Sequence, residues 1–502
     1  MGQEGIQNEL GNKMKLGKTS EKPLEKIALI QPPDPEGTVV LRDHAGKFGI
    51  LEKKTSVIRY DVFPPLDLAY SAALLEKNGF DVSIIDSPTL NLDRSRILRE
   101  VVRKNPDLII VNTSGVTLSN DLDLASWLKR TLEIETVAIT PAYLPENVLK
   151  EKGIDIFVRG EIEYTILELC QKYPDIKGIK GILYKEHGNF FYNPKRPLIE
   201  NLDELPPPAY HLLPMKEYSF HMFKGKSFST TMTSRGCPFC CIYCPYPLGY
   251  GDVWRGKNPE NVLAELRMLK EEYKIESVLF RDQVFNFIPE RTEKICDEMI
   301  KQHVDIDWRC ECRADLLSKE LMMKMKKAGC AGVHMGVESG DPLILKKIAK
   351  TGLSIERIKK VFNEAREIDL EALAFFMIGF PGETKESISK TFNLARELKA
   401  KQSWFCATVP YPGTKLCELA EKKGWILTKN LEDYTGRNVV MRNDSLTEDD
   451  IRNAVDAANI MFSKGNTQIL KTVFSLQGVS SLLLDPKKAV KFTLGRFKNK
   501  KW

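Results

Sequence analysis

The stretch SRGCPFCCIYC, residues 234–244, places three cysteines in a C-x3-C-x2-C pattern directly after an apolar, β-prone run. A structural zinc site takes four ligands, which Cys237, Cys241 and Cys244 do not complete. Three thiolates can instead hold three irons of a [4Fe-4S] cluster, whose usual protein complement is four cysteines. The fourth iron is then open, as a catalytic metal keeps one position free for substrate. A zinc knuckle or buried thiols are the alternatives.

The composition narrows the class of protein. A chain of 502 residues suggests two or three domains, and an apolar fraction of 42% suffices for sizeable cores. The net charge of +6 is too small for this length to indicate a nucleic-acid partner. Eleven cysteines, four of them within eight residues, do not resemble a disulfide framework and suit a reducing cytosol, so we expect a cytoplasmic protein. No apolar run reaches the length of a membrane span, and the polar start, residues 1–23, is expected to be a disordered tail without a signal peptide.

Short β-prone runs alternate with amphipathic helical segments from residue 24 to residue 200. Apolar strands separated by helices predict a parallel sheet covered on both faces, which is a doubly wound, Rossmann-like α/β domain. Ligands of such sheets bind beyond the carboxyl ends of the strands. The expected strands cover residues 27–30, 82–85, 108–111, 137–139 and 156–158, and the expected helices cover residues 66–77, 93–104, 120–132, 145–152 and 165–172.

A proline-rich linker, residues 201–226, precedes a second domain expected over residues 227–425. Six strand-and-helix units can be traced in it, and repeated units of this kind are right-handed and close toward a barrel. Six units, not eight, predict a partial (β/α)6 barrel with its functional groups at the carboxyl ends of the strands. The expected strands cover residues 228–233, 277–280, 307–310, 332–336, 372–378 and 404–409.

The cysteine loop is followed by RDQVF (281–285), RCECRAD (309–315), GVESG (336–340) and IGFPGET (378–384), each at the end of an expected strand. In this order and spacing, these motifs resemble those of the radical S-adenosylmethionine (SAM) superfamily, in which the open iron binds SAM. The resemblance implies that Tyr243, just before the last cysteine, packs on the SAM adenine. It also implies that Asp282 accepts a hydrogen bond from the SAM ammonium. A helix N-cap is the alternative role for Asp282.

Three further strand ends carry residues with roles implied by the same resemblance. Arg313 is expected to meet the SAM carboxylate, or else to pair with Asp315. Glu338 is expected to bind ribose hydroxyls or the amino group, because a carboxylate after an apolar strand is costly unless paired. Gly379 lets the backbone approach a flat ligand such as adenine, or belongs to a simple strand-to-helix turn capped by Thr384 or Glu383.

The first domain resembles the cobalamin-binding domain that precedes many radical SAM cores, through the stretches PPLDLAY (64–70), NGFDV (78–82) and RGEIEYT (159–165). The resemblance implies that the loops after the third, fourth and fifth strands hold the corrin and its nucleotide tail. The usual Gly-Gly pair is replaced by TPA (140–142), and no Asp-x-His-x-x-Gly segment supplies a histidine for cobalt. An empty scaffold that shapes the substrate cavity is the alternative. The candidate residues are Thr113, Ser114, Thr117, Thr140, Gly160 and Glu161.

The activity implied by the resemblance begins with one electron passing from the cluster into SAM, which yields a deoxyadenosyl radical. With cobalamin, we expect methylation of an unactivated carbon of a small-molecule or lipid-like substrate, with an electron donor such as ferredoxin or flavodoxin. Two alternatives stand: radical-mediated oxidative cyclisation or rearrangement, as in the anaerobic magnesium-protoporphyrin monomethyl ester cyclase, and a non-catalytic iron–sulfur or regulatory protein. The sequence assigns no catalytic residue and no substrate.

Other residues leave their roles open. Cys240 is not expected to be a cluster ligand. Cys310 and Cys312 are expected to be buried or bystander thiols, with a second metal or a reactive thiol as the alternative. His44 lies in a long loop and is expected to be a surface or hydrogen-bonded residue unless it faces substrate.

The last segment, residues 426–502, is expected to be a helical extension. A helix from about residue 447 to residue 464 is expected to close over the barrel. Residues 486–502 carry seven Lys or Arg and no acid, interleaved with apolar and aromatic side chains. Such a basic amphipathic stretch is typical of interfacial segments, so we expect contact with a membrane or a lipidic substrate. An ordinary solvated tail is the alternative.

Overall fold

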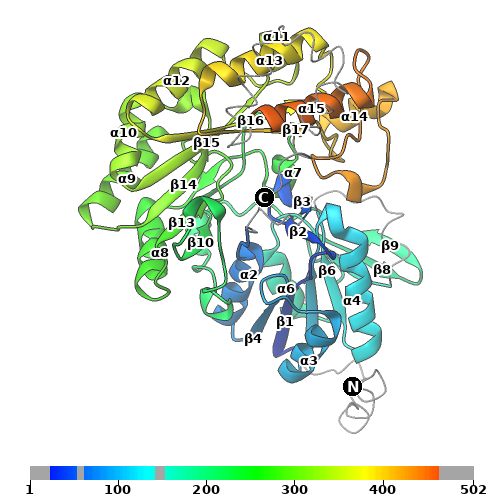
Figure 1. Cartoon of the computed structure of the whole chain (residues 1–502). Coiled ribbons are helices and arrows are strands. Elements are labelled where there is room, and N and C mark those ends of the chain that lie inside the picture. Colours follow the sequence, from blue (N-terminus) through cyan, green and yellow to red (C-terminus); the bar gives the residue numbers. More distant parts are fainter. Residues whose placement is uncertain (1–22, 54–60, 142–152, 463–502) are drawn as a thin grey trace, which may run out of the picture. The chain divides into compact units, whose positions relative to one another are not determined.

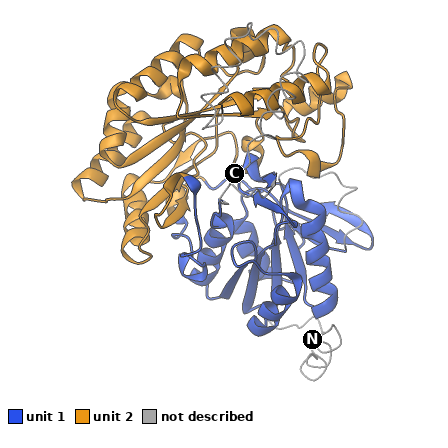
Figure 2. Cartoon of the chain, viewed as in Figure 1, with its two compact units in different colours: residues 1–199, 204–221 blue, residues 200–203, 222–502 orange. Residues whose placement is uncertain are grey.

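The computed structural model describes residues 23–53, 61–141 and 153–462 (Figure 1). The chain divides into two compact units, residues 1–199 with 204–221 and residues 200–203 with 222–502 (Figure 2). The expected helix at 145–152 and the basic segment 486–502 lie outside the described residues. Within the described part, no helix has both the length and the apolar character needed to cross a membrane.

Unit 1 is built on a seven-stranded sheet in the order β4-β1-β5-β6-β7-β8-β9. The first five strands are parallel, as predicted, and the last two extend the sheet in antiparallel fashion. Sequence analysis missed β8 and β9, because they are short and lack a continuous apolar run. The strands are β4 (Asp81–Asp86), β1 (Lys26–Gln31), β5 (Leu108–Asn112), β6 (Thr136–Ile139), β7 (Ile156–Val158), β8 (Ile182–Glu186) and β9 (Asn189–Tyr192).

Helices cover both faces of the unit 1 sheet, which explains why the inner residues of β1, 27–30, are apolar and buried. Ile27 and Leu29 belong to a buried cluster shared with α2 and α6, while Ala28 and Ile30, which alternate with them, are equally buried. The α3 helix begins at an N-cap, since the Asp93 carboxylate accepts a hydrogen bond from Arg96 N. The helices are α2 (Leu66–Lys77), α3 (Arg94–Lys104), α4 (Leu118–Leu132) and α6 (Glu163–Lys172).

The strand order of unit 1 contains one topological switch point. The chain runs from β1 to β4 on one side and then to β5 on the other, so the order reverses between β1 and β5. Ligands of doubly wound sheets bind at this switch point, beyond the carboxyl ends of the strands. The connection from β1 to α2 also holds a hairpin that sequence analysis missed, β2 (Thr38–Leu41) with β3 (Ile50–Lys53).

Unit 2 contains a six-stranded sheet in the order β10-β13-β14-β15-β16-β17, with all neighbours parallel. The first and last strands do not pair, so the sheet forms the predicted partial (β/α)6 barrel. The strands are β10 (Phe228–Thr231), β13 (Ser277–Phe280), β14 (Asp307–Cys312), β15 (Cys330–Glu338), β16 (Glu371–Ile378) and β17 (Gln402–Ala407). The helices between them include α8 (Pro259–Glu271), α9 (Pro289–Lys301), α10 (Lys319–Lys327), α12 (Ile355–Glu367) and α13 (Lys385–Leu398).

The last described helix, α15 (Glu448–Phe462), packs along the edge strand β17. Asn459 accepts a hydrogen bond from Phe405 N and donates one to Phe405 O, at 3.3 and 2.9 Å. The side chain thereby replaces the missing neighbouring strand at this position, where an edge would otherwise leave backbone groups unpaired. The helix expected to close over the barrel therefore covers the open edge of its sheet.

Candidate active site

The cysteine loop leaves β10 through a tight turn that requires glycine. A short strand, β11 (Ser234–Arg235), pairs with β12 (Arg255–Gly256), and Gly236 follows with a φ of +83°. A Cβ atom at Gly236 would lie 1.9 Å from the carbonyl oxygen of Val253, so no other residue fits. Immediately after this turn, Cys237 N donates a hydrogen bond to Gly251 O at 3.1 Å. The first cysteine is thus fixed by the backbone around it.

Asp282, at the carboxyl end of β13, holds the beginning of the same loop. Its carboxylate accepts hydrogen bonds from Thr233 N, Thr233 Oγ1 and Ser234 Oγ at 2.7, 2.6 and 2.6 Å. Burial raises its pKa, and these three donors oppose the rise. Asp282 does not cap α9, whose N-cap is Ile288, so the alternative role predicted for it is not found. Its oxygens hold the start of the loop, and its contact with the SAM ammonium stays a prediction.

The three predicted ligands differ from Cys240 in their surroundings. Cys237 is buried and Cys241 and Cys244 are half-buried, whereas Cys240 is exposed. In residues 23–53, 61–141 and 153–462, no three His, Cys, Asp or Glu side chains are arranged to hold a single metal ion. Burial raises the pKa of the Cys237 and Cys241 thiols and raises that of Cys244 to about 12. A thiolate here needs positive partners, and the irons of a cluster supply them, so the donor set fits a [4Fe-4S] cluster.

Tyr243 and Glu338 lie together beside the cysteine loop. The Tyr243 ring packs against Phe380 from the loop after β16, with ring centroids 5.3 Å apart. Glu338 Oε1 accepts a hydrogen bond from Lys350 Nζ at 2.5 Å, and Lys350 Nζ lies 3.5 Å from Tyr243 OH. Burial raises the pKa of Tyr243 well above its ordinary value, with the Glu338 charge contributing. The structure therefore brings two predicted SAM-contacting residues into one polar cluster.

Arg313 adopts the alternative role expected for it. Its guanidinium makes two hydrogen bonds to the Asp315 carboxylate, at 3.0 and 2.8 Å, and donates a third to Thr351 O at 2.6 Å. The guanidinium also stacks on Phe239 of the cysteine loop, 3.5 Å from the ring centroid. The pair with Asp315 leaves the cation next to the loop, where it can still meet an anionic ligand group.

Gly379 lies in a turn that a buried carboxylate closes. Its φ is +105°, and its N–H donates to Glu383 Oε2 at 2.5 Å, as does Phe380 N at 3.2 Å. Burial raises the pKa of Glu383 to about 8, against the effect of these two donors. Asn443 donates to Phe380 O and Glu383 O and so holds the turn from outside.

In unit 1, three predicted cobalamin-contacting residues lie in the turn between β5 and α4. Thr113 Oγ1 donates to Ile139 O at 2.7 Å, and Ser114 Oγ lies 2.7 Å from Thr117 Oγ1. Thr117 Oγ1 donates in turn to Asp121 Oδ2 at 2.6 Å, and Ser114 N donates to the same oxygen at 3.2 Å. The hydroxyls of this loop therefore stabilise its own shape.

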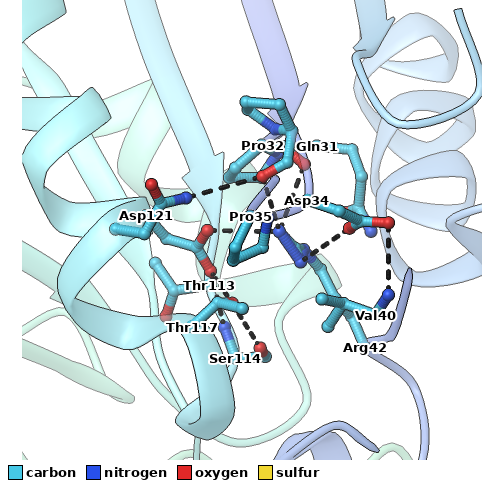
Figure 3. Close-up of polar contacts among 12 residues, drawn as sticks. Gln31, Pro32, Asp34, Pro35, Val40, Arg42, Thr113, Ser114, Thr117 and Asp121 are labelled. Atoms are coloured by element: carbon cyan, nitrogen blue, oxygen red, sulfur yellow. Dashed lines mark hydrogen bonds and ion pairs between the residues drawn. The ribbon is translucent and has the colours of Figure 1, made fainter. Parts of the chain in front are cut away.

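Asp121 also forms a buried ion pair with Arg42, from the connection after β1 (Figure 3). Arg42 Nη2 lies 3.2 Å from Asp121 Oδ1 and donates as well to Pro32 O at 3.2 Å. Arg42 Nη1 lies 3.8 Å from Asp34 Oδ1, and neither Nε nor Nη1 has a hydrogen-bond partner among the described residues. This pair joins the loops that follow β1 and β5, which flank the switch point. The spare buried donors there fit an acceptor-rich ligand such as the amide-bearing rim of cobalamin.

The remaining predicted cobalamin residues follow the neighbouring strands. Thr140 Oγ1 donates to Val158 O at 3.3 Å, and Glu161 Oε2 accepts from Ile199 N at 2.7 Å. Gly160 has a φ of +81° with open space where a Cβ would lie. Its carbonyl accepts a hydrogen bond from Lys47 Nζ at 3.2 Å. The predicted loops thus lie at the carboxyl ends of β5, β6 and β7, which are adjacent in the sheet.

His44, Cys310 and Cys312, whose roles the sequence left undecided, contact neighbouring side chains of the protein. His44 Nδ1 lies 2.9 Å from Asp43 Oδ1, and its ring stacks near Phe63 at 6.2 Å. The sulfur atoms of Cys310 and Cys312 are 3.5 Å apart, and both residues are buried. Burial raises the pKa of Cys310 well above its ordinary value, so it is held as a thiol.

Several site residues escaped sequence analysis. Lys350 and Arg42 lie in connecting loops outside any motif, and Glu383 was considered only as a helix cap. Asp121 had a detectable signal, since it lies on a helical segment four and seven residues before the apolar Ala125 and Leu128. An acid on the apolar face of a helix indicates a buried partner.

Comparison with known proteins gives two family matches. Residues 231–395 match the radical SAM superfamily, and residues 56–170 match the B12 binding domain. An uncharacterized methyltransferase of Pyrococcus horikoshii is 35% identical over 422 residues, which cover 83% of this chain and 91% of the relative. The anaerobic magnesium-protoporphyrin IX monomethyl ester cyclase of Rubrivivax gelatinosus is 25% identical over 410 residues, covering 78% and 72% of the two chains.

The fold also resembles a solved structure. The cobalamin-dependent SAM radical enzyme OxsB, determined with aqua-cobalamin and SAM bound, superposes with a TM-score of 0.68 at 15% identity. The match covers 94% of this chain and 71% of OxsB. It extends the likeness in fold over both units of the chain.

A cysteine series tests the ligand assignment. Cys237→Ala, Cys241→Ala and Cys244→Ala are each expected to lose most of the iron and sulfide bound after anaerobic reconstitution, because each removes one thiolate ligand. Cys240→Ala is the matched control and is expected to keep the wild-type content, since its thiol is exposed. Iron and sulfide assays read the result. Loss in Cys240→Ala with retention in one of the other three would overturn the assignment.

Asp121 is expected to make unit 1 more stable in mild acid. Burial raises its pKa from 3.8 to about 6, although Arg42 and two hydrogen bonds oppose the rise. Between about pH 4 and pH 6 the folded form keeps a proton that the unfolded form loses. This contribution is therefore complete only below the unfolded pKa of 3.8, disappears as the pH rises through about 6, and amounts to about 3 kcal/mol at about 1.4 kcal/mol per pKa unit.

Hydrogen exchange of the 113–132 peptides measures this effect, with Asp121→Asn compared with wild type at each pH. The protection of wild type relative to the variant is expected to grow from pH 6 toward pH 4. Asp123→Asn, an exposed position on the same helix, serves as the control and should show no such trend. A difference between wild type and Asp121→Asn that stays constant with pH would contradict the expectation.

Proposed function

The chain belongs to the radical SAM superfamily and carries a B12 binding domain, and we propose that it methylates an unactivated carbon of a small-molecule or lipid-like substrate with cobalamin as the methyl carrier. It is an enzyme with a [4Fe-4S] cluster, SAM and cobalamin as cofactors. The proposal rests chiefly on one observation, the 35% identity to a methyltransferase over 83% of this chain.

Within this proposal, the cysteine loop holds the cluster. When bound, the cluster supplies the electron that cleaves SAM. Cys237, Cys241 and Cys244 would be its ligands, on a loop fixed by Gly236 and by the hydrogen bonds to Asp282. A loop anchored where it begins keeps its first ligand thiol in one geometry, which favours a defined orientation of reacting groups.

The residues around the loop would bind SAM. Tyr243 offers an aromatic face, and Phe380 continues this apolar surface. Glu338, held by Lys350, offers an acceptor for the amino group or ribose hydroxyls. Arg313 offers a cation for the carboxylate and is held by Asp315. Each polar side chain is already oriented by a partner, so it is positioned before the ligand arrives.

In unit 1, the loops after β5, β6 and β7 would hold cobalamin. The hydroxyl protons of Thr113, Thr117 and Thr140 already have acceptors within unit 1, so hydrogen-bond donors to the ligand would come from the backbone and from Arg42. The described residues place no histidine in these loops, in keeping with cobalt bound without a histidine ligand.

The proposal further includes an external electron donor, such as ferredoxin or flavodoxin, and membrane contact through residues 486–502. The basic charge of residues 486–502 motivates the proposed membrane contact.

A liposome flotation assay with anionic vesicles tests the membrane contact. The full chain is expected to float, and a chain ending at Asp485 is expected to stay with the soluble fraction. Equal behaviour of the two would remove the membrane contact.

Methyl transfer is tested with SAM carrying a deuterated methyl group. The reconstituted full-length protein, with hydroxocobalamin and dithionite, is incubated anaerobically with a small-molecule and lipid extract. We expect 5′-deoxyadenosine, S-adenosylhomocysteine and an extract compound that has gained the deuterated methyl, all detected by mass spectrometry. Cys241→Ala, treated identically, is the control and should give none of them.

The other outcomes separate the alternatives. A product that has lost hydrogen without gaining label would favour the cyclisation chemistry named for the Rubrivivax relative. Protein that loses all hydroxocobalamin on gel filtration would remove cobalamin from the reaction. No deoxyadenosine above the Cys241→Ala level would leave a non-catalytic iron–sulfur protein.

A further inference from the structure

A short connection between α11 (Pro342–Lys347) and α12, residues 348–354, joins several parts of the site. Ile348 O accepts a hydrogen bond from Ile242 N of the cysteine loop at 3.1 Å. Two residues later, Lys350 reaches Glu338, and Thr351 O accepts the hydrogen bond from Arg313. One segment that matches no motif therefore contacts the cysteine loop and the ends of β14 and β15.

Within this connection, Lys350 forms a buried ion pair with Glu338. Their side chains are 9% and 8% exposed. Glu338 has a φ of +67°, which is strained for a residue with a side chain, and the register of β15 shifts between Gly336 and Glu338. A Cβ atom at Gly336 would lie 2.3 Å from Glu338 Oε1 and 2.7 Å from Lys350 Nζ. A strained backbone and a glycine thus both accommodate this pair.

The ion pair also lies against the cysteine loop. Lys350 Nζ is 3.5 Å from the hydroxyl of Tyr243, the residue directly before Cys244. The hydrogen bond from Ile242 N to Ile348 O fixes the Lys350 connection to the same loop, one residue after Cys241. The charges lie in a buried region where water screens them weakly, so their effect on a neighbouring charged group is larger than at the surface.

From this arrangement we propose that Lys350 is a positioning residue that orients Glu338 and, with it, sets the reduction potential of the bound cluster. Reduction adds one negative charge to the cluster. A fixed ammonium nearby stabilises that charge and raises the potential, while a fixed carboxylate lowers it. The inference rests on the proposed function, because it takes the cluster to be bound by Cys237, Cys241 and Cys244.

A redox titration of the reconstituted full-length protein, followed by electron paramagnetic resonance in the absence of substrate, tests the proposal. Lys350→Met is expected to shift the potential to more negative values and Glu338→Gln to more positive values. The double variant is expected to fall between them. Lys350→Arg keeps the charge and should stay close to wild type. Lys346→Met removes an exposed lysine of α11 and should leave the potential unchanged.

The outcomes are read only from variants whose iron and sulfide content equals that of wild type. The proposal would be overturned if the reduction potential of the cluster stayed unchanged in Lys350→Met and Glu338→Gln, or shifted in the same direction in both. A purely structural role does not predict shifts of opposite sign. Where Lys350→Met fails to hold a cluster, Glu338→Gln decides, and an unshifted potential there overturns it. Failure of the proposed function would appear differently, as absence of deoxyadenosine or methylated product from wild type with its cluster intact.

Discussion

A buried carboxylate, that of Asp282, fixes the loop on which the proposed chemistry depends. It receives three short hydrogen bonds from the two residues that precede the loop, so the end of β13 determines where the chain leaves β10. An isolated buried charge would be costly, and the three donors, together with the nearby Arg291 charge, offset that cost. The close turn at Gly236 follows at once, and with it the place of Cys237. Removing the Asp282 carboxylate would leave the three donors of Thr233 and Ser234 unpaired in the interior. The whole cysteine loop would then lose its geometry.

The same principle recurs at the other strand ends, where charged side chains are held by partners before any ligand is present. In unit 2, Lys350 holds Glu338, and Asp315 holds Arg313. In unit 1, Arg42 holds Asp121, which holds the turn after β5. Buried pairs of this kind contribute little net stability, because desolvation consumes most of the attraction. Removing one partner is nevertheless expensive, so each pair restricts its loop to one arrangement. Their concentration at the carboxyl ends, where ligands of parallel sheets bind, is consistent with a role in preorganising the sites.

The fold was accessible from the sequence because short β-prone runs alternate with amphipathic helical segments. The five parallel strands of unit 1 and the six of unit 2 were predicted from this alternation. The strands β2, β3, β8 and β9 were missed because they are short and pair as antiparallel hairpins, which lack the alternation of strand and helix. The cysteine loop was found through its spacing, a local property. Spacing along the sequence could not identify Lys350 as the partner of Glu338. Their contact depends on the path by which the connection after α11 comes back to the end of β15. A single polar residue in a loop gives no periodic sequence pattern that would predict this path.

The predicted cobalamin residues show how position and role can differ. Thr113 and Thr140 lie at the ends of adjacent strands, as expected, yet each hydroxyl donates to the carbonyl of the next strand, Ile139 O and Val158 O. A hydroxyl that has given away its only proton can offer a ligand nothing but its lone pairs. Ligand recognition at these positions must then use acceptors and backbone groups, and donors must come from elsewhere. Arg42 is suited to that task, since two of its nitrogens have no hydrogen-bond partner among the described residues although the side chain is buried. The sequence pattern identifies the loops, and the hydrogen bonds within them determine which atoms are left to bind.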